Sequence, residues 1–426
     1  MTGLHIRPGS VEGVRVAPAS KSYTHRALVA AASLAVPLRI QNPLDSDDTR
    51  ATREALLRLR YPVTDSDGGW AVGAREPSAS RGRPVRIDCG ESGTTLRFVT
   101  ALAGRDARTV HLVGRPGLGV RPMDGLLNAL GDLGATASRD PGPPWSVRIV
   151  GPVHAGAVRV PAFETSQFVS ALLLSLAGLD SPSEILPEGP IVSRPYLTAT
   201  LRLLDRLGAR IQARQRGWAV GGDRGRGTRS WTVPGDISSA AYLWTAAAVS
   251  GGDVRTEGLN LDWPQADQAM LGILREAGAH VEARRGWVRV RGRARRPFSV
   301  NLDDAPDLLP LAGALAATIP GRSRILGARH AAEKESDRRQ ETAVLVRQLG
   351  AAESLAPTRL DIVGVEHPRP LRGFASRDHR LVASAGVAAL AASGTSVVRY
   401  PTAVRKSYPG LWDDLRALGA SLEGDR

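Results

Sequence analysis

Hydrophobic residues gather in six Ala- and Leu-rich segments, each of which begins with a few polar residues. These segments are apolar around most of their circumference, a pattern typical of buried helices. Their polar starts recur at intervals of 72, 72, 72, 69 and 72 residues. The starts contain Ser22, Thr94, Ser166, Ser238, Asp307 and His379. Because a fixed period indicates an internally repeated fold, the chain is predicted to contain six copies of one repeat.

Each repeat continues with a short β-prone stretch, such as 38–40 or 396–398, then a loop and an amphipathic helix. Five of these second helices end at a glycine, the residue that terminates a helix in the left-handed conformation at little steric cost. The glycines are Gly134, Gly208, Gly278, Gly350 and Gly419. In the first repeat, Leu59-Arg60-Tyr61 stands in the same place. A hairpin follows the helix and a strand precedes the repeat, so each repeat is predicted to be a βαβαββ unit.

Length and composition predict two domains of three repeats each. The chain has 426 residues with 42% hydrophobic and 23% charged residues, which suits a folded protein too long for one ordinary core. The Gly/Arg-rich stretch 221–227 is a candidate linker near the point where the chain passes from one domain to the other.

No apolar leader is present at the start, and the longest apolar runs, such as 168–179, are too short to span a bilayer. A cytoplasmic protein is therefore expected.

The chemistry of the side chains argues against metals and disulfides but leaves the partner open. Cys89 is the single cysteine, and no metal-binding or Walker spacing occurs. The net charge of +14 is compatible with either nucleic acid or a small anionic substrate. Arginine supplies 53 of the 56 cationic side chains (56 minus the three lysines Lys21, Lys334 and Lys406), and the lysines lie in polar runs at or before predicted helix starts.

Helix N-termini favour an anionic ligand, because free backbone N–H groups and the positive end of the helix dipole point at it. Arginines and hydroxyl residues also cluster in the loops before the second helices, where a guanidinium could hold phosphate or carboxylate. These loops contain Arg121, residues 193–196, residues 334–338 and residues 405–407. The pattern suits a small substrate bearing several phosphates and carboxylates.

Four motifs together resemble the 3-phosphoshikimate 1-carboxyvinyltransferase (EPSP synthase) family. They are residues 19–26 (Ala-Ser-Lys-Ser-Tyr-Thr-His-Arg), residues 90–97 (Gly-Glu-Ser-Gly-Thr-Thr-Leu-Arg), Thr165-Ser166-Gln167 and residues 334–338 (Lys-Glu-Ser-Asp-Arg). Asp378-His379-Arg380 and residues 406–409 agree with it. The resemblance covers nearly the whole chain.

The resemblance implies a two-domain α/β (α+β) fold, an inside-out α/β barrel built from six βαβαββ units with three per domain. It implies one domain at 20–233 and a second at 1–19 plus 234–426. The implied reaction transfers the enolpyruvyl group of phosphoenolpyruvate to the 5-hydroxyl of shikimate 3-phosphate and releases phosphate. No cofactor and no metal are expected, and a monomer without nucleic-acid or membrane partners is expected.

The resemblance also implies the site residues. Lys21, Asp307 and Glu335 would be catalytic, with Asp307 nearer the attacking hydroxyl and Glu335 nearer the methylene; which is acid and which is base is left open. Shikimate 3-phosphate would be bound by Lys21, Ser22, Arg26, Thr165, Ser166, Gln167, Ser193, Tyr196, Asp307 and Lys334. Phosphoenolpyruvate would be bound by Lys21, Gly93, Arg121, Gln167, Arg338, Arg380 and Lys406. For Asp307 the alternative is helix N-capping, and for Glu335 it is a surface ion pair.

Two other readings remain. The sister enolpyruvyltransferase acting on UDP-N-acetylglucosamine typically has a catalytic cysteine in the loop that is 114–121 here, and this loop has none. An RNA 3'-terminal phosphate cyclase-like protein would be built from related units, but aromatic residues for stacking on bases are sparse.

The sequence departs from the family's usual pattern at two places. Many relatives have proline at the position of Phe98, and a commoner Asn-Ala pair at the position of Glu91-Ser92. These departures leave open whether the inhibitor glyphosate acts on the protein.

Overall fold

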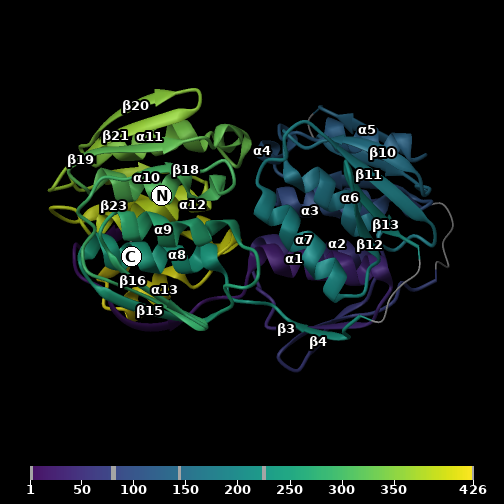
Figure 1. The fold of residues 1–426 in the computed structure, drawn as a ribbon, viewed down its shortest axis with the longest axis horizontal. Helices are drawn as coiled ribbons and strands as arrows, with labels where there is room; N and C mark the ends of the chain where they lie inside the picture. Colours follow the sequence, from purple (N-terminus) through teal and green to yellow (C-terminus); the bar gives the residue numbers. More distant parts are fainter. Residues whose placement is uncertain (1–2, 78–82, 143–144, 223–226, 425–426) are drawn as a thin grey trace. The chain divides into compact units, whose positions relative to one another are not determined.

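The computed structural model describes residues 3–77, 83–142, 145–222 and 227–424. Residues 223–226 of the candidate linker lie outside this part of the chain. The chain divides into two compact units, which Figure 1 draws in different ranges of the sequence colours. Unit 1 contains Met1–Pro18 and Pro234–Arg426, and unit 2 contains Ala19–Val233.

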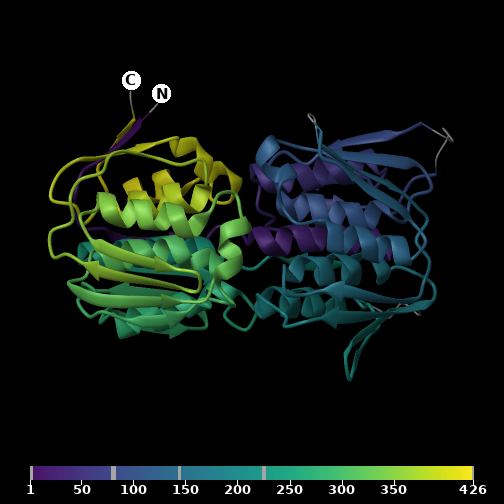
Figure 2. The ribbon, with the colours of Figure 1, turned by 90° about the horizontal axis from the view of Figure 1, so that it is seen from above.

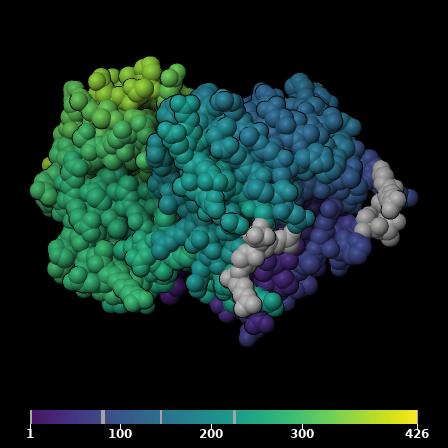
Figure 3. Space-filling model, turned by 45° about the vertical axis from the view of Figure 1, so that its right-hand side comes forward, coloured from purple at the N-terminus to yellow at the C-terminus, as the bar shows by residue number. Residues whose placement is uncertain are grey.

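Unit 2 holds three four-stranded sheets of the same pattern. In each sheet the first two strands pair in parallel, and the third and fourth strands each pair antiparallel with the strand before them. Their strand orders are β14 (Ser230–Thr232), β3 (Leu38–Gln41), β5 (Gly69–Val72), β4 (Val63–Ser66); β6 (Val85–Asp88), β7 (Thr109–Val113), β9 (Ser146–Val150), β8 (Thr136–Asp140); and β10 (Ala157–Pro161), β11 (Pro182–Glu188), β13 (Gly217–Gly221), β12 (Ile211–Arg214). Strand β14, from the end of this unit's sequence, completes the first sheet. Early and late segments of this unit both reach its surface (Figure 3).

Unit 1 repeats the pattern in three more four-stranded sheets. Their orders are β16 (His280–Arg284), β17 (Gly286–Arg291), β15 (Asp253–Leu259), β2 (Glu12–Val16); β18 (Ser299–Asn301), β19 (Gly321–Leu326), β21 (Arg359–Gly364), β20 (Ala352–Ala356); and β22 (Arg372–Ala375), β23 (Ser396–Arg399), β1 (Gly3–Ile6), β24 (Leu422–Gly424). The N-terminal strands β1 and β2 thus pair with strands more than 200 residues later in the sequence. The expected mixed α/β fold is confirmed.

The six Ala-rich segments are helices, as predicted, and nearly all of their residues are buried. They are α1 (Lys21–Leu34), α3 (Gly93–Ala103) and α6 (Ser166–Leu176) in unit 2, and α8 (Ile237–Ser250), α10 (Leu309–Ala317) and α12 (His379–Ala389) in unit 1. Within each unit the three helices contact one another, and Figure 2 shows them side by side. They form the core of each unit.

The second helices of the repeats are only partly buried. They are α2 (Asp47–Arg58), α5 (Asp124–Asp132), α7 (Arg194–Arg206), α9 (Ala269–Glu276), α11 (Arg338–Gln348) and α13 (Leu411–Ala417). All five predicted terminal glycines have the expected positive φ, from 83° to 98°. In the first repeat Arg60 takes this conformation, with φ at 72°. The remaining helical segments are short: α4 (Pro116–Gly119), η1 (Ala266–Gln268), η2 (Pro306–Leu308), η3 (Arg329–Glu333) and η4 (Pro401–Lys406).

A single arginine shows that the buried helices of unit 2 run in one direction. Arg105 follows α3, and its guanidinium donates to the carbonyls of Ser33 at the end of α1 and of Gly178 just beyond α6. The C-terminal ends of the three helices therefore meet at one place, where a cation complements the negative ends of their dipoles. Their N-terminal ends, which carry the predicted binding residues, meet at the opposite end. Among the described residues, no helix is long and apolar enough to cross a membrane.

Candidate active site

In unit 2, side chains at the starts of α3 and α6 are hydrogen-bonded to each other. The amide of Gln167 donates from Nε2 to Thr94 Oγ1 at 3.2 Å and accepts from Arg97 Nη1 at 2.7 Å. Thr165 caps α6, because its hydroxyl accepts from the Gln167 backbone N–H, and the next residue, Ser166, is buried. Two helix N-termini thus present hydroxyls and an amide at one place.

Lys21, the first residue of α1, contacts the start of α2. Its Nζ lies 2.9 Å from Asp48 Oδ2, and the Asp48 side chain is only 7% exposed. A buried carboxylate at this distance fixes the position of the ammonium group, since a charge-assisted hydrogen bond is both strong and directional. Lys21 is therefore held at the N-terminal end of α1.

Arg26, one turn further along α1, is buried and hydrogen-bonded to neutral oxygens. It donates to Thr200 Oγ1 at 2.8 Å and to the backbone carbonyls of Ser22 at 2.9 Å and Tyr196 at 3.0 Å. Its guanidinium also lies over the rings of Phe98 and Tyr196. Burial lowers the pKa of Arg26 to about 10. A cation held by neutral groups keeps its positive charge available for an anion.

Gly93 and Arg121 are close neighbours. A Cβ at residue 93 would lie 2.5 Å from Arg121 Nη1, so the guanidinium lies directly against the first residue of α3. Ser193 is buried and has a left-handed φ of 53° immediately before α7, the helix that carries Tyr196. All the site residues predicted in 20–233 thus lie at or near helix N-termini of unit 2.

In unit 1, Asp307 lies among three cations. Its carboxylate accepts from Arg338 Nη1 at 2.6 Å and from Arg380 Nη2 at 2.8 Å, and Lys334 Nζ is 3.9 Å away. Burial alone would raise the pKa of Asp307, but these cations hold it well below its ordinary value. Asp307 lies within η2, whose N-cap position is occupied by Ala305, and its carboxylate contacts the cations of the cluster.

Arg338, the first residue of α11, contacts the other carboxylates of this cluster. Its side chain is 2% exposed and contacts Glu335 as well as Asp378 at 2.7 Å. Burial would lower the pKa of Arg338, but Asp378, Glu335 and Asp307 raise it. Glu335 is largely buried and also lies 3.8 Å from Lys406 Nζ. It is therefore part of a buried network, not of a surface ion pair.

The structure adds residues to which the sequence analysis gave no role in the site. They are Asp48 beneath Lys21, Arg97 on Gln167, Asp378 on Arg338, and Asp267, which lies 3.4 Å from Arg380. Asp48 and Asp267 stand at the starts of second elements of their repeats, as Arg338 does. Comparing that position across all six repeats could have found them.

One group of possible metal ligands occurs among the described residues, formed by Glu335, Asp378 and His379. Both carboxylates contact the Arg338 guanidinium, which would have to be displaced by a metal ion. Because a buried guanidinium already neutralises these carboxylates, the group does not fit a metal.

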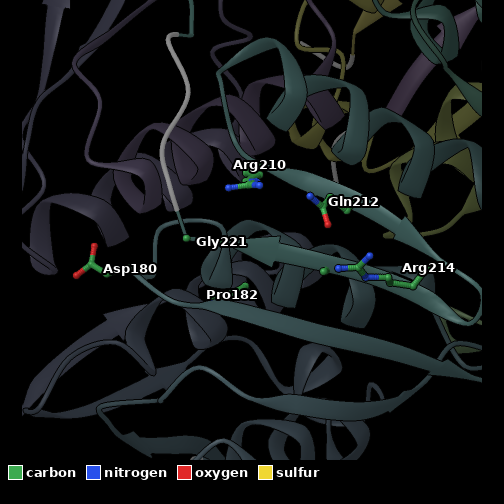
Figure 4. A pocket seen from close by; sticks show the side chains of 8 residues that line it. Asp180, Pro182, Arg210, Gln212, Arg214 and Gly221 are labelled. Carbon is green, nitrogen blue, oxygen red and sulfur yellow. The ribbon is translucent and has the colours of Figure 1, made fainter.

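Two hollows in unit 2 lie apart from these residues. One, of about 320 Å³, is formed by β12, β13 and the residues around Asp180 and Pro182, with Arg210, Gln212 and Arg214 along one side (Figure 4). The other, of about 200 Å³, is lined by residues around Arg86 and His111. None of the predicted site residues lines either hollow.

Comparison with known proteins identifies the family. The model of EPSP synthase (3-phosphoshikimate 1-carboxyvinyltransferase) matches residues 7–415. The 3-phosphoshikimate 1-carboxyvinyltransferase of Thermococcus kodakarensis is 39% identical over 415 residues, which cover 97% of this chain and 99% of the relative. The enzyme of that name from Halorubrum lacusprofundi is 36% identical over 451 residues, covering 99% of both chains.

Solved structures show the same fold at lower identity. An EPSP synthase from Acinetobacter baumannii has a TM-score of 0.81 at 22% identity and covers all of both chains. The enolpyruvyl transferase NikO from Streptomyces tendae has a TM-score of 0.78 at 20% identity and covers 100% of this chain and 99% of its own. With the sequence matches along nearly the full length, these findings show that the chain belongs to the EPSP synthase (3-phosphoshikimate 1-carboxyvinyltransferase) family.

Proposed function

We propose that this chain transfers the enolpyruvyl group of phosphoenolpyruvate to the 5-hydroxyl of shikimate 3-phosphate through Asp307 and Glu335. Asp307 takes the hydroxyl proton as the oxygen bonds to C2 of phosphoenolpyruvate, and Glu335, which is protonated at the start of the cycle, gives its proton to the methylene carbon. Glu335 then removes a proton from the new methyl group as the C2–phosphate bond breaks. The products are the enol ether and phosphate, which takes up the proton left on Asp307.

The observation that carries this proposal is the contact of one buried guanidinium, Arg338, with both Asp307 and Glu335. A base has to be ionised at neutral pH, and the lowered pKa of Asp307 satisfies this requirement. Glu335 lies between Arg338 and Lys406. Cations on both sides of this pair would stabilise the charge that moves onto the departing phosphate.

Binding roles are divided between the two units. In unit 2, Lys21 would touch both substrates, and Gly93 and Arg121 would hold phosphoenolpyruvate, while Gln167 would contact both. The residues proposed for shikimate 3-phosphate there are Ser22, Arg26, Thr165, Ser166, Ser193 and Tyr196. In unit 1, Arg338, Arg380 and Lys406 would hold phosphoenolpyruvate, and Asp307 and Lys334 would hold shikimate 3-phosphate.

The test is release of phosphate when the protein is mixed with shikimate 3-phosphate and phosphoenolpyruvate without ATP and with a chelator present. Release that depends on both substrates is expected. Release only with UDP-N-acetylglucosamine would favour the sister enzyme, and consumption of ATP with an RNA 3'-phosphate would favour the cyclase. The buried Cys89, whose pKa burial raises, is unsuited to replace the sister enzyme's cysteine.

The remaining expectations complete the proposal. The two domains would be 20–233 and 1–19 plus 234–426, each an inside-out barrel of three βαβαββ units. The protein would act in the cytoplasm as a monomer on small molecules alone, without cofactor, metal, nucleic acid or membrane. Light scattering on the purified protein tests the monomer, because a dimer would double the mass of 45.1 kDa.

A further inference from the structure

Asp267 is a buried carboxylate that the proposed reaction does not use. It lies in η1, a short segment that contacts both α8 and α9, and its side chain is 0% exposed. Its Oδ2 is 3.4 Å from Arg380 Nη1. Arg380 is thus contacted by two carboxylates, because its Nη2 donates to Asp307 Oδ2 at 2.8 Å.

The two carboxylates differ in what they can reach. Asp307 is 17% exposed and is the proposed base, so it has to interact with the substrate hydroxyl during the reaction. Asp267 is fully enclosed and cannot follow a substrate. When Asp307 turns from Arg380 to the substrate hydroxyl, Asp267 stays in contact with Arg380.

We propose that Asp267 is a positioning residue that holds the Arg380 guanidinium in place for an anionic group of phosphoenolpyruvate. The inference rests on the proposed function, which places Arg380 against that substrate. An arginine that is already oriented loses less side-chain freedom when it binds a carboxylate or phosphate in its fork geometry.

The surroundings of Asp267 agree with such a role. Burial raises its pKa to about 6, while Arg380 and a hydrogen bond with Ser238 lower it, and the nearby Asp307 and Asp236 raise it. Arg380 and Ser238 therefore stabilise the charged form of Asp267 against the cost of burying it. Removing this charge would take away a buried carboxylate that contacts the Arg380 guanidinium.

The test is the variant Asp267→Asn, which keeps the shape of the side chain and removes its charge. We expect KM for phosphoenolpyruvate to rise about ten- to a hundredfold, the scale of a lost charged hydrogen bond. KM for shikimate 3-phosphate should stay within about twofold and kcat within about threefold. The matched control is Asp361→Asn, on β21 of the same unit, whose carboxylate pairs with Arg324 and Arg359 on the sheet and should leave both KM values unchanged.

Equal rises in the two KM values, or a lower kcat with an unchanged KM for phosphoenolpyruvate, would overturn the inference. If Asp267→Asn fails to fold, as judged by its melting temperature, Asp267→Glu serves instead. That variant keeps the charge but shifts it by one methylene, and it should raise the same KM by a smaller factor. Absence of phosphate release by the unchanged protein would contradict the proposed function, whereas normal release with no selective effect of Asp267→Asn contradicts this inference alone.

Discussion

The buried arginines at the helix N-termini of the two units have different partners, although both units are built from the same repeat. In unit 2, the buried Arg26 donates its hydrogen bonds to neutral oxygens. In unit 1, the cations lie against carboxylates. Each of four cations in this unit contacts at least one of four carboxylates. The cations are Lys334, Arg338, Arg380 and Lys406, and the carboxylates are Asp267, Asp307, Glu335 and Asp378.

This difference separates two tasks. A cation that is held by neutral groups keeps its full attraction for an incoming anion, so Arg26 is suited to binding. A cation that contacts a carboxylate is itself held in place, and it stabilises the charged form of that carboxylate in a buried position. We infer that the buried Arg26 of unit 2 serves binding, whereas the cations of unit 1 also position carboxylates, among them the proposed Asp307 and Glu335.

The largest effect should come from removing Arg338. Arg338→Met leaves Asp307, Glu335 and Asp378 without a shared cation, and breaking a buried ion pair in this way typically costs about 3–5 kcal/mol. Denaturant unfolding at neutral pH measures the loss. Because protonation neutralises stranded carboxylates, the loss should shrink as the pH falls toward about 5.

Arg26→Met is the matched variant in unit 2. It removes a buried guanidinium that bonds to neutral oxygens, so no carboxylate partner among those hydrogen bonds is stranded, and its effect on unfolding should be smaller and nearly independent of pH in that range. Equal losses for the two variants would show that the arrangements of charge are energetically alike and would remove the basis of the comparison.

Lys21→Arg tests whether unit 2 also takes part in the chemistry. A planar fork does not replace a compact ammonium with three donors, and Lys21 is fixed by Asp48 at 2.9 Å. We expect kcat to fall about a hundredfold or more, the scale for losing one preorganised electrostatic contact, with little change in melting temperature. The exposed Arg285, changed to Lys, is the control with near-normal turnover. Near-normal turnover of Lys21→Arg would mean that a cation of either shape suffices there.

Gly93→Ala should have a smaller and more selective effect. The added methyl group would lie 2.5 Å from Arg121 Nη1, so the guanidinium has to move. We expect KM for phosphoenolpyruvate to rise roughly tenfold, which corresponds to about 1.4 kcal/mol, and inhibition by glyphosate to weaken at least as much. Gly117→Ala, where a Cβ meets nothing within 4 Å, is the control in the short helix α4. A KM equal to that of the control would show that Arg121 moves without loss.

The helices and their order could be predicted because hydrophobic pattern and glycine placement are local properties of the sequence. The start of each buried helix and the left-handed glycines follow from the repeat alone. The motifs that pointed to the family also named Asp307 and Glu335. The assignment of residues 1–19 to the same domain as 234–426 came from the resemblance, because no local signal distinguishes the first strands from others.

The partners of the site residues could not be predicted in the same way. Asp48 is the second residue of α2 and Asp267 is the second residue of η1, so in the sequence both look like ordinary acidic residues of a helix start. Their role depends on which side chain the fold brings opposite them, and Lys21 and Arg380 are 27 and 113 residues away in the chain. The surroundings of Asp307 likewise depend on three cations that only the fold brings together.

The smallest effect concerns the one second helix of the repeats that ends without glycine. Arg60 has a φ of 72°, a conformation that is strained for a residue with a Cβ, whereas Gly419 occupies the equivalent place with a φ of 98°. Arg60→Gly should raise the free energy of unfolding by about 0.5–1 kcal/mol, because the relief of strain is partly offset by the greater freedom of glycine in the unfolded chain. Gly419→Ala should lower it by about 1 kcal/mol, since a Cβ there has open space and only the backbone is strained. Denaturant unfolding of both variants measures the pair, and a destabilised Arg60→Gly would mean that contacts of the Arg60 side chain outweigh the strain.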